Sequence, residues 1–89
     1  MLVRSVIVGS RVGLHARPAT LLAECVQSEG IEVEISKGEE EDFVDASSIL
    51  MIMTLGASHG ETVTIRSEDA TIEQIEKIAK LIESDLDGE

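Results

Sequence analysis

The sequence is poor in aromatic and in basic residues. Phe43 is the only aromatic residue among 89, so the hydrophobic core has to be built from Ile, Val, Leu, Ala and Met. Seven lysines and arginines stand against 18 acidic residues, which gives a formal net charge of -11. Nucleic acids and anionic membranes are bound by clustered positive charge, so this composition argues against both as partners.

The chain also lacks the features of a secreted or membrane-spanning protein. Its single cysteine, Cys25, excludes an internal disulfide and fits a reducing cytosol, so we expect a cytoplasmic protein. No basic segment followed by an apolar one opens the sequence, so we expect no signal peptide. The longest apolar run, Ile49–Met53, is far shorter than the roughly 20 residues of a membrane span, so we expect no membrane insertion.

The hydrophobic pattern predicts one domain, residues 1–89, with four strands and three helices. Strands are predicted at 2–8, 31–35, 43–44 and 62–66, and helices at 16–28, over about two turns ending at 54, and at about 70–86. The pattern does not decide which face of the first strand is buried. One face carries Leu2, Val6 and Val8, and the other carries the residues that alternate with them. This βαββαβα order fits a two-layer α+β sandwich whose helices cover one face of the sheet and leave the other solvated.

Two of the predicted helices have an apolar stripe that should face the core. In the first helix the stripe is Ala19, Leu22, Ala23 and Val26, and in the last it is Ile72, Ile75, Ile78, Ala79, Ile82 and Leu86. The last helix also carries two acid–base pairs at the favourable spacing of four, Glu73–Lys77 and Glu76–Lys80. The acid run in 36–42 is expected to be a solvated loop, because consecutive carboxylates lack the alternate spacing of a calcium loop.

The short second helix is apolar on every side. Asp45, Ser47 and Ser48 precede it, and all three are residue types that cap helix N-termini. A chain this small cannot cover such a helix all round, so some of its apolar side chains should reach the surface: Ile49, Leu50, Met51 and Met53. An exposed apolar patch of this kind indicates a docking surface, and methionine suits binding to more than one partner.

The segment Gly13–Ala19, GLHARPA, brings a histidine and an arginine to the start of the first helix. If His15 lies at or just before the N-cap, the N–H groups of Ala16 and Arg17 are free and form an anion site. Pro18 has no N–H and contributes no donor. The Arg17 guanidinium adds a planar cation. The field of the helix N-terminus disfavours imidazolium, so we expect His15 to be neutral and nucleophilic, and able to carry a phosphoryl group.

The residues alone leave open that His15 is an ordinary helix-cap residue. Other chemistries have less support. His15, Cys25 and His59 lack the spacing of a metal site, so no metal is expected. A phosphate-binding GxxxxGK motif is absent from the sequence, and no Ser-His-Asp arrangement can be argued from spacing. We expect no cofactor.

The GLHARPA segment, followed by DASSILMIMTLGA at 45–57 and by the Gly in HGE at 59–61, resembles the HPr family. These are the histidine-containing phosphocarriers of the bacterial sugar phosphotransferase system, and the resemblance covers nearly the whole chain. The second segment is most similar to actinobacterial members. The resemblance implies an open-faced sandwich of four antiparallel strands and three helices, and a monomer acting as a stoichiometric carrier, not an enzyme.

The resemblance also implies roles for individual residues. His15 would accept the phosphoryl group on Nδ1 from phosphorylated enzyme I and pass it to a histidine of an enzyme IIA domain of a sugar permease. Arg17 would support the group in both transfers, and the second helix, chiefly Ile49, Leu50 and Met51, would dock on these partners. We expect no role in transfer for Cys25 or His59.

Some positions depart from the family pattern. Glu24 and Gln27 stand where several members have lysine, so this face of the chain is less basic than usual. We expect the partner that binds it to be matched in charge. Ser48 lies where some members carry a serine phosphorylated by a dedicated kinase, but Ser47 replaces a lysine usual in those members, and a simple N-cap role competes. A regulatory relative that binds transcription factors or metabolic enzymes is the alternative function.

Overall fold

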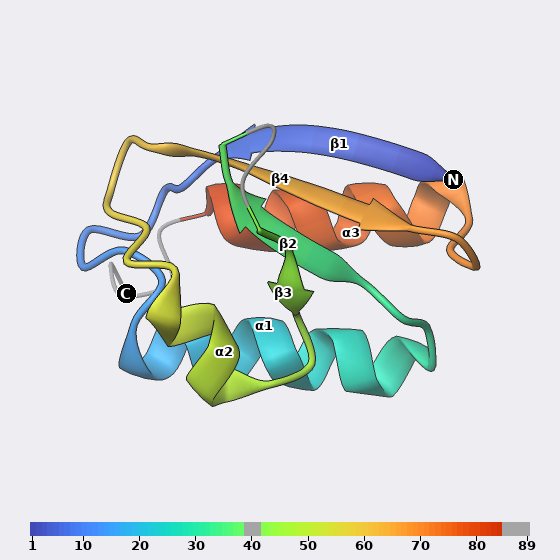
Figure 1. Cartoon of the computed structure of the whole chain (residues 1–89), viewed down its shortest axis with the longest axis horizontal. Helices are drawn as coiled ribbons and strands as arrows, with labels where there is room; N and C mark the ends of the chain where they lie inside the picture. The colour runs from blue at the N-terminus through green and yellow to red at the C-terminus, as the bar shows by residue number, and fades with distance from the viewer. Residues whose placement is uncertain (39–41, 85–89) are drawn as a thin grey trace.

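The computed structural model of the chain describes residues 1–38 and 42–84, in which the predicted elements follow one another in the predicted order (Figure 1). The strands are β1 (Leu2–Ile7), β2 (Glu34–Lys37), β3 (Val44–Asp45) and β4 (Thr62–Ser67). The helices are α1 (Ala16–Glu29), α2 (Ile49–Thr54) and α3 (Ile72–Glu83). All neighbouring strands are antiparallel, in the sheet order β1-β4-β2-β3. The predicted α+β fold class is confirmed.

The molecule has two layers, with α1 and α3 on one face of the sheet and α2 packed against α1 near β3 (Figure 1). Aliphatic side chains of both layers form the core, among them Val6, Val8, Val33, Ile35, Val63 and Ile65 from the sheet side and Leu22, Val26, Ile52, Ile75, Ile78 and Ile82 from the helices. Burial of Val6 and Val8 shows which side of β1 faces the core. None of the helices described is long and apolar enough to cross a membrane.

The second strand is displaced from its predicted position. Val33 and Ile35 are buried as the alternation requires, but the strand covers Glu34–Lys37 instead of 31–35. Side chains at the end of β4 and just after it satisfy the backbone at residue 32: the Ser67 hydroxyl donates to the Glu32 carbonyl at 2.6 Å, and the Glu32 amide donates to Asp69 at 3.1 Å. A side chain can therefore replace a strand partner without changing which residues face the core.

Helix α3 starts two residues later than predicted, because Thr71 caps it. The Thr71 hydroxyl accepts from the Gln74 amide at 3.1 Å, and the Gln74 side chain accepts from the Thr71 amide at 2.9 Å, which together form a capping box. Ile72 is 69% exposed, contrary to its predicted place in the stripe. Helical side chains point toward the N-terminus, so a first-turn residue points past the end of the helix. Leu86 and residues 39–41 lie outside the described residues.

The charged residues of α3 form ion pairs with other elements. Arg4 of β1 donates to Glu76 at 2.8 Å, and Lys77 donates to Glu29 at the end of α1 at 2.7 Å. These hydrogen bonds lower the pKa of both carboxyls, Glu76 and Glu29. Two of the residues predicted to pair along the helix therefore join α3 to β1 and to α1.

The face of the sheet opposite the helices is less solvated than predicted. Ser5, Thr64 and Ser36 form a row across β1, β4 and β2, and the last two are buried. On the same face, the guanidinium carbon of Arg66 lies 3.7 Å from the centroid of the Phe43 ring. The only aromatic residue thus lies outside the core and forms a cation–π contact.

Two substitutions in α2 test the division between its buried and exposed sides. Ile52 is fully buried, whereas Leu50 is 68% exposed. We expect Ile52→Ala to lower the free energy of unfolding by about 2–4 kcal/mol through lost packing and a cavity. Leu50→Ala should change it by less than about 0.5 kcal/mol. Urea unfolding of the two variants checks this, and equal losses would contradict the placement of the helix.

Candidate functional site

His15 is the N-cap residue of α1, as predicted. Its backbone is extended, with φ of -121° and ψ of 165°, and its side chain makes no capping hydrogen bond. N-cap side chains usually accept a hydrogen bond from the first turn of the helix. Because the His15 ring does not, a half-exposed imidazole stands beside the helix N-terminus without serving as its cap.

The first turn of α1 leaves backbone donors at this end of the helix. The first hydrogen bond of the helix runs from the Ala19 amide to the His15 carbonyl at 3.3 Å. Ala16 and Arg17 precede it, so their amides have no carbonyl within the helix to bind, and Pro18 has no N–H. Two backbone amides without an intrahelical acceptor therefore lie next to His15, as an anion site at a helix N-terminus requires.

Ala16 has an unusual backbone conformation that the sequence did not indicate. Its φ is 40°, the only positive φ of a non-glycine residue among those described. The left-handed region costs an L-residue with a Cβ about 1–2 kcal/mol. Such a conformation persists only where neighbouring structure holds it, and it is common at functional sites. The first residue of α1, next to His15, is therefore held in a strained conformation.

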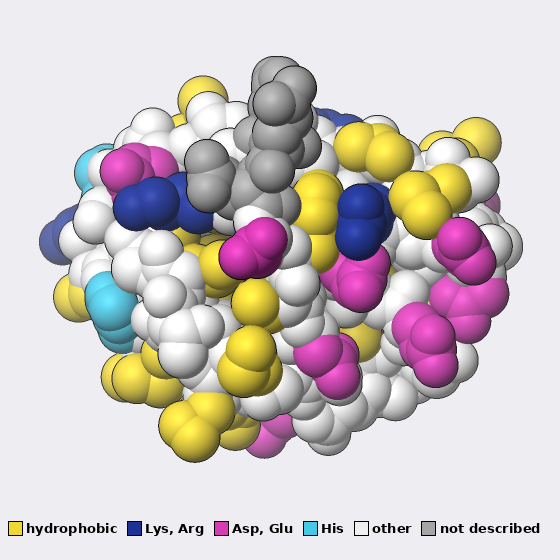
Figure 2. Space-filling model, viewed as in Figure 1, with side chains coloured by type: hydrophobic (Ala, Val, Ile, Leu, Met, Phe, Trp, Pro, Cys, Tyr) yellow, Lys and Arg dark blue, Asp and Glu magenta, His cyan; other side chains and the backbone are white. Residues whose placement is uncertain are grey.

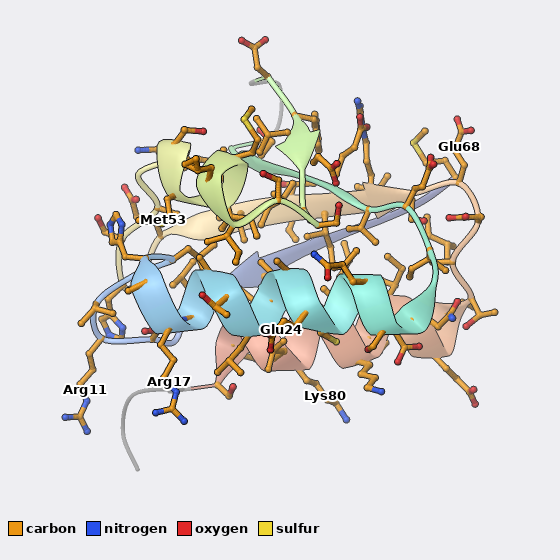
Figure 3. All side chains as sticks on the ribbon, turned by 90° about the horizontal axis from the view of Figure 1, so that it is seen from below. Arg11, Arg17, Glu24, Met53, Glu68 and Lys80 are labelled. Atoms are coloured by element: carbon orange, nitrogen blue, oxygen red, sulfur yellow. The ribbon has the colours of Figure 1, made fainter. Side chains whose placement is uncertain are left out.

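Arg17 is exposed and extends from the end of the molecule where α1 begins (Figure 3). Within residues 1–38 and 42–84 its guanidinium makes no ion pair or hydrogen bond. Figure 3 shows Arg11 and Met53 at this same end. Arg17 is thus accessible to an incoming anion, and Arg11, which the sequence did not single out, adds positive charge nearby.

Ser48 is the N-cap of α2, and this structural role is confirmed. Its hydroxyl accepts from the Met51 amide at 3.2 Å. Asp45 in turn accepts from the amide and the hydroxyl of Ser47, and these hydrogen bonds lower the pKa of the Asp45 carboxyl. Gln27 of α1 donates to the Ser47 carbonyl at 2.8 Å. These contacts fix the start of α2 against α1.

The apolar side chains of α2 reach the surface, as predicted. Exposed fractions are 38% for Ile49, 68% for Leu50, 41% for Met51 and 38% for Met53. We call these four residues the α2 patch. Figure 2 shows hydrophobic side chains gathered at the end of the molecule that also bears histidine, over the position of α2 in Figure 1. Met53 of the patch lies at the same end of the molecule as Arg17 (Figure 3).

The loop before α1, residues 8–14, rests on the loop before β4, residues 56–61. Val8 donates to the Glu61 carbonyl at 2.9 Å, and Leu14 donates to the Ala57 carbonyl at 3.0 Å. His59 Nδ1 lies 3.2 Å from the carbonyl oxygen of Ser10. No local sequence signal indicates this contact, because 49 positions separate the two residues.

Cys25 and Glu24 lie further along α1 than His15 and Arg17. In the two described ranges, no three His, Cys, Asp or Glu side chains are grouped to hold a metal ion. Cys25 is half-buried against the core, and burial raises the pKa of its thiol. Glu24 is exposed on α1, further along the helix than Arg17 (Figure 3).

Substitution of Gly13 measures how close residues 8–14 and residues 56–61 have to be. The φ of Gly13 is 79°, and a Cβ there would lie 2.4 Å from the Ala57 carbonyl oxygen. Gly56 has a φ of 64° with no atom within 4 Å of such a Cβ. We expect Gly56→Ala to cost about 1–2 kcal/mol for backbone strain alone. Gly13→Ala should cost about 1–3 kcal/mol more, because the loops have to separate. Urea unfolding measures both, and equal costs would contradict the tight approach.

Comparisons with known proteins agree with this geometry. Residues 2–84 match the family described as PTS HPr component phosphorylation site. The phosphocarrier protein HPr of Streptomyces coelicolor is 36% identical over 85 residues, which cover 94% of this chain and 90% of the relative. The HPr of Haloferax volcanii is 34% identical over 79 residues, covering 84% and 89%.

Solved structures have the same fold. The crystal structure of HPr from Bacillus anthracis superposes with a TM-score of 0.82 at 30% identity, covering 91% of this chain and 95% of that one. A match that spans nearly the whole chain, together with the histidine at the N-cap of α1, identifies the family. The chain belongs to the HPr family of phosphocarriers of the phosphotransferase system.

Proposed function

We propose that this chain relays a phosphoryl group from phosphorylated enzyme I through His15 to enzyme IIA domains of sugar permeases, in the cytoplasm and as a monomer. The observation that carries the proposal is the His15 ring, which stands at the N-cap of α1 without capping it. The amides of Ala16 and Arg17 lie at the same helix N-terminus, where an anion is stabilised.

The transfer needs a neutral imidazole with a free lone pair on Nδ1. That lone pair attacks the phosphorus of the donor phosphohistidine as the donor N–P bond breaks, and the bonding electrons return to the donor ring. The phosphoryl oxygens then meet the amides of Ala16 and Arg17 and the Arg17 guanidinium. Passing the group on to the acceptor histidine reverses these steps. No cofactor is required, and the chain acts as a stoichiometric carrier and not as an enzyme.

The α2 patch supplies the docking surface in this proposal. Its four apolar side chains are exposed, and Met53 lies at the same end of the molecule as Arg17. A partner could bury them at little cost in polar desolvation. Enzyme I and the IIA domains would share this surface, and flexible methionines favour such reuse. Docking would position the two histidines, and this positioning lowers the barrier together with the electrostatic stabilisation of the transferring group.

Regulation at Ser48 stays a prediction. A kinase-delivered phosphate would remove the cap that Ser48 offers to the Met51 amide, and it would lie at the edge of the α2 patch. Asp45, two residues before Ser47, adds negative charge at this place. A role as a regulatory relative, binding a transcription factor or a metabolic enzyme through the same patch, is the alternative function. Partner binding that is unchanged by phosphorylation of His15 would favour it.

The carrier function predicts the behaviour of two site variants. Incubation with enzyme I and phosphoenolpyruvate should label the natural chain with acid-labile phosphate, and His15→Ala should abolish the label. Arg17→Ala should still accept phosphate, with a maximal rate lowered about 10- to 100-fold, because one preorganised donor to the transferring group is lost.

Labelling is measured by phosphate retention before and after mild acid. Cys25→Ala serves as the control, because Cys25 lies on the core side of α1 away from the site, and it should label like the natural chain. If His15→Ala labels equally, the proposal is wrong.

The docking role of the α2 patch predicts a binding defect without a folding defect. Leu50→Ala should raise the KM for enzyme I about 5- to 30-fold, as expected for loss of a central apolar contact. Ile72→Ala is a matched control, because Ile72 is 69% exposed against 68% for Leu50 but lies on α3. Steady-state transfer kinetics compare the two. An equal KM for both variants would place docking elsewhere.

A further inference from the structure

We propose that His59 is a positioning residue, which holds the loop before His15 through a hydrogen bond from its Nδ1–H to the Ser10 carbonyl. This inference rests on the proposed phosphoryl transfer at His15. It assigns a role to a residue that sequence reasoning had set aside. The ring nitrogen and the carbonyl oxygen are 3.2 Å apart.

The bond lies in the middle of a segment whose ends are already fixed. At one end Val8 donates to Glu61 and accepts from Gly60, both at 2.9 Å, and at the other Leu14 donates to Ala57 at 3.0 Å. Between them the chain turns through Ser10, whose carbonyl also accepts from the Gly13 amide at 3.0 Å. The His59 side chain therefore provides a contact between residues 56–61 and the centre of this turn.

The chemistry of the acceptor determines the state of the ring. A carbonyl oxygen can only accept, so His59 has to carry a proton on Nδ1 to form the bond. Both the imidazolium and the Nδ1–H tautomer of the neutral ring meet this condition. Donation to Ser10 therefore does not depend on whether the ring is charged.

The turn that His59 holds leads directly into the strained part of the site. Gly13 at φ of 79° lies against the Ala57 carbonyl, and Ala16 has a φ of 40° immediately after His15. Strained backbone requires support from its surroundings. A looser turn at Ser10 lets residues 13–16 relax and moves the His15 ring from its position for transfer. Transfer rates depend on such positions, and a displacement of about 1 Å can cost up to about 100-fold.

Two variants whose side chains have a similar shape distinguish hydrogen-bond donation from packing. Asn and Leu both branch at Cγ, and the Asn amide nitrogen takes the place of Nδ1, whereas Leu offers no donor there. With enzyme I and phosphoenolpyruvate, His59→Leu should lower the maximal rate of His15 phosphorylation roughly 3- to 10-fold with an unchanged KM. His59→Asn should stay within about 2-fold of the natural chain. Ser58→Ala, an exposed change in the same loop, is the control and should have no effect.

The kinetic pattern decides the inference. A slow Leu variant, a normal Asn variant and a common KM support it, and faster hydrogen exchange of the Gly13 amide in the Leu variant alone would locate the change. A Leu variant as fast as the natural chain, equal losses in both variants, or a change confined to KM would overturn it. His15→Ala, assayed in parallel, tests the carrier function separately. If labelling depends on His15 but not on the His59 donor, only the role of His59 fails.

Discussion

The position of His15 depends on the hydrogen bonds between residues 8–14 and residues 56–61. These two loops lie far apart in the sequence, and backbone pairs at Val8 and Leu14 join them. Gly13 permits the closest approach, because any side chain there would meet the Ala57 carbonyl. The side chain of Leu14, one residue before His15, is buried in the core. The imidazole thus stands on an irregular segment that the rest of the fold holds in place.

The scarcity of aromatic residues affects both the core and the surface. Branched aliphatic residues from the sheet and the helices fill the interior, and the two long helices present narrow stripes to it. Helix α2 buries only Ile52 and leaves four large apolar side chains exposed. Exposing these four apolar side chains to water is unfavourable in the free protein. The same exposure suits a protein that binds and releases partners, because an interface can bury the apolar area.

The strong negative charge is unevenly placed with respect to the site. Arg11 and Arg17 lie at the end where α1 begins, whereas Glu24 lies further along the same helix (Figure 3). Several acidic residues form ion pairs with bases of the same chain, as Glu29 does with Lys77 and Glu76 with Arg4. The end of the molecule that carries His15 therefore combines local positive charge with helix-terminal amides, on a chain whose net charge is -11.

The sequence by itself determined the element order, most of the core stripes and the place of His15, because these follow from hydrophobic periodicity and from the start signals of helices. It wrongly placed Ile72 in the stripe of α3, where the first turn points past the end of the helix. It also indicated that α2 had to be partly exposed. Only the tertiary structure decided the features that depend on distant residues. Ser67 and Asp69 replace a strand partner for Glu32, Lys77 pairs with Glu29 instead of Glu73, and His59 reaches Ser10. The positive φ of Ala16 belongs to this second group, because local preference opposes it and only the surrounding contacts can maintain it.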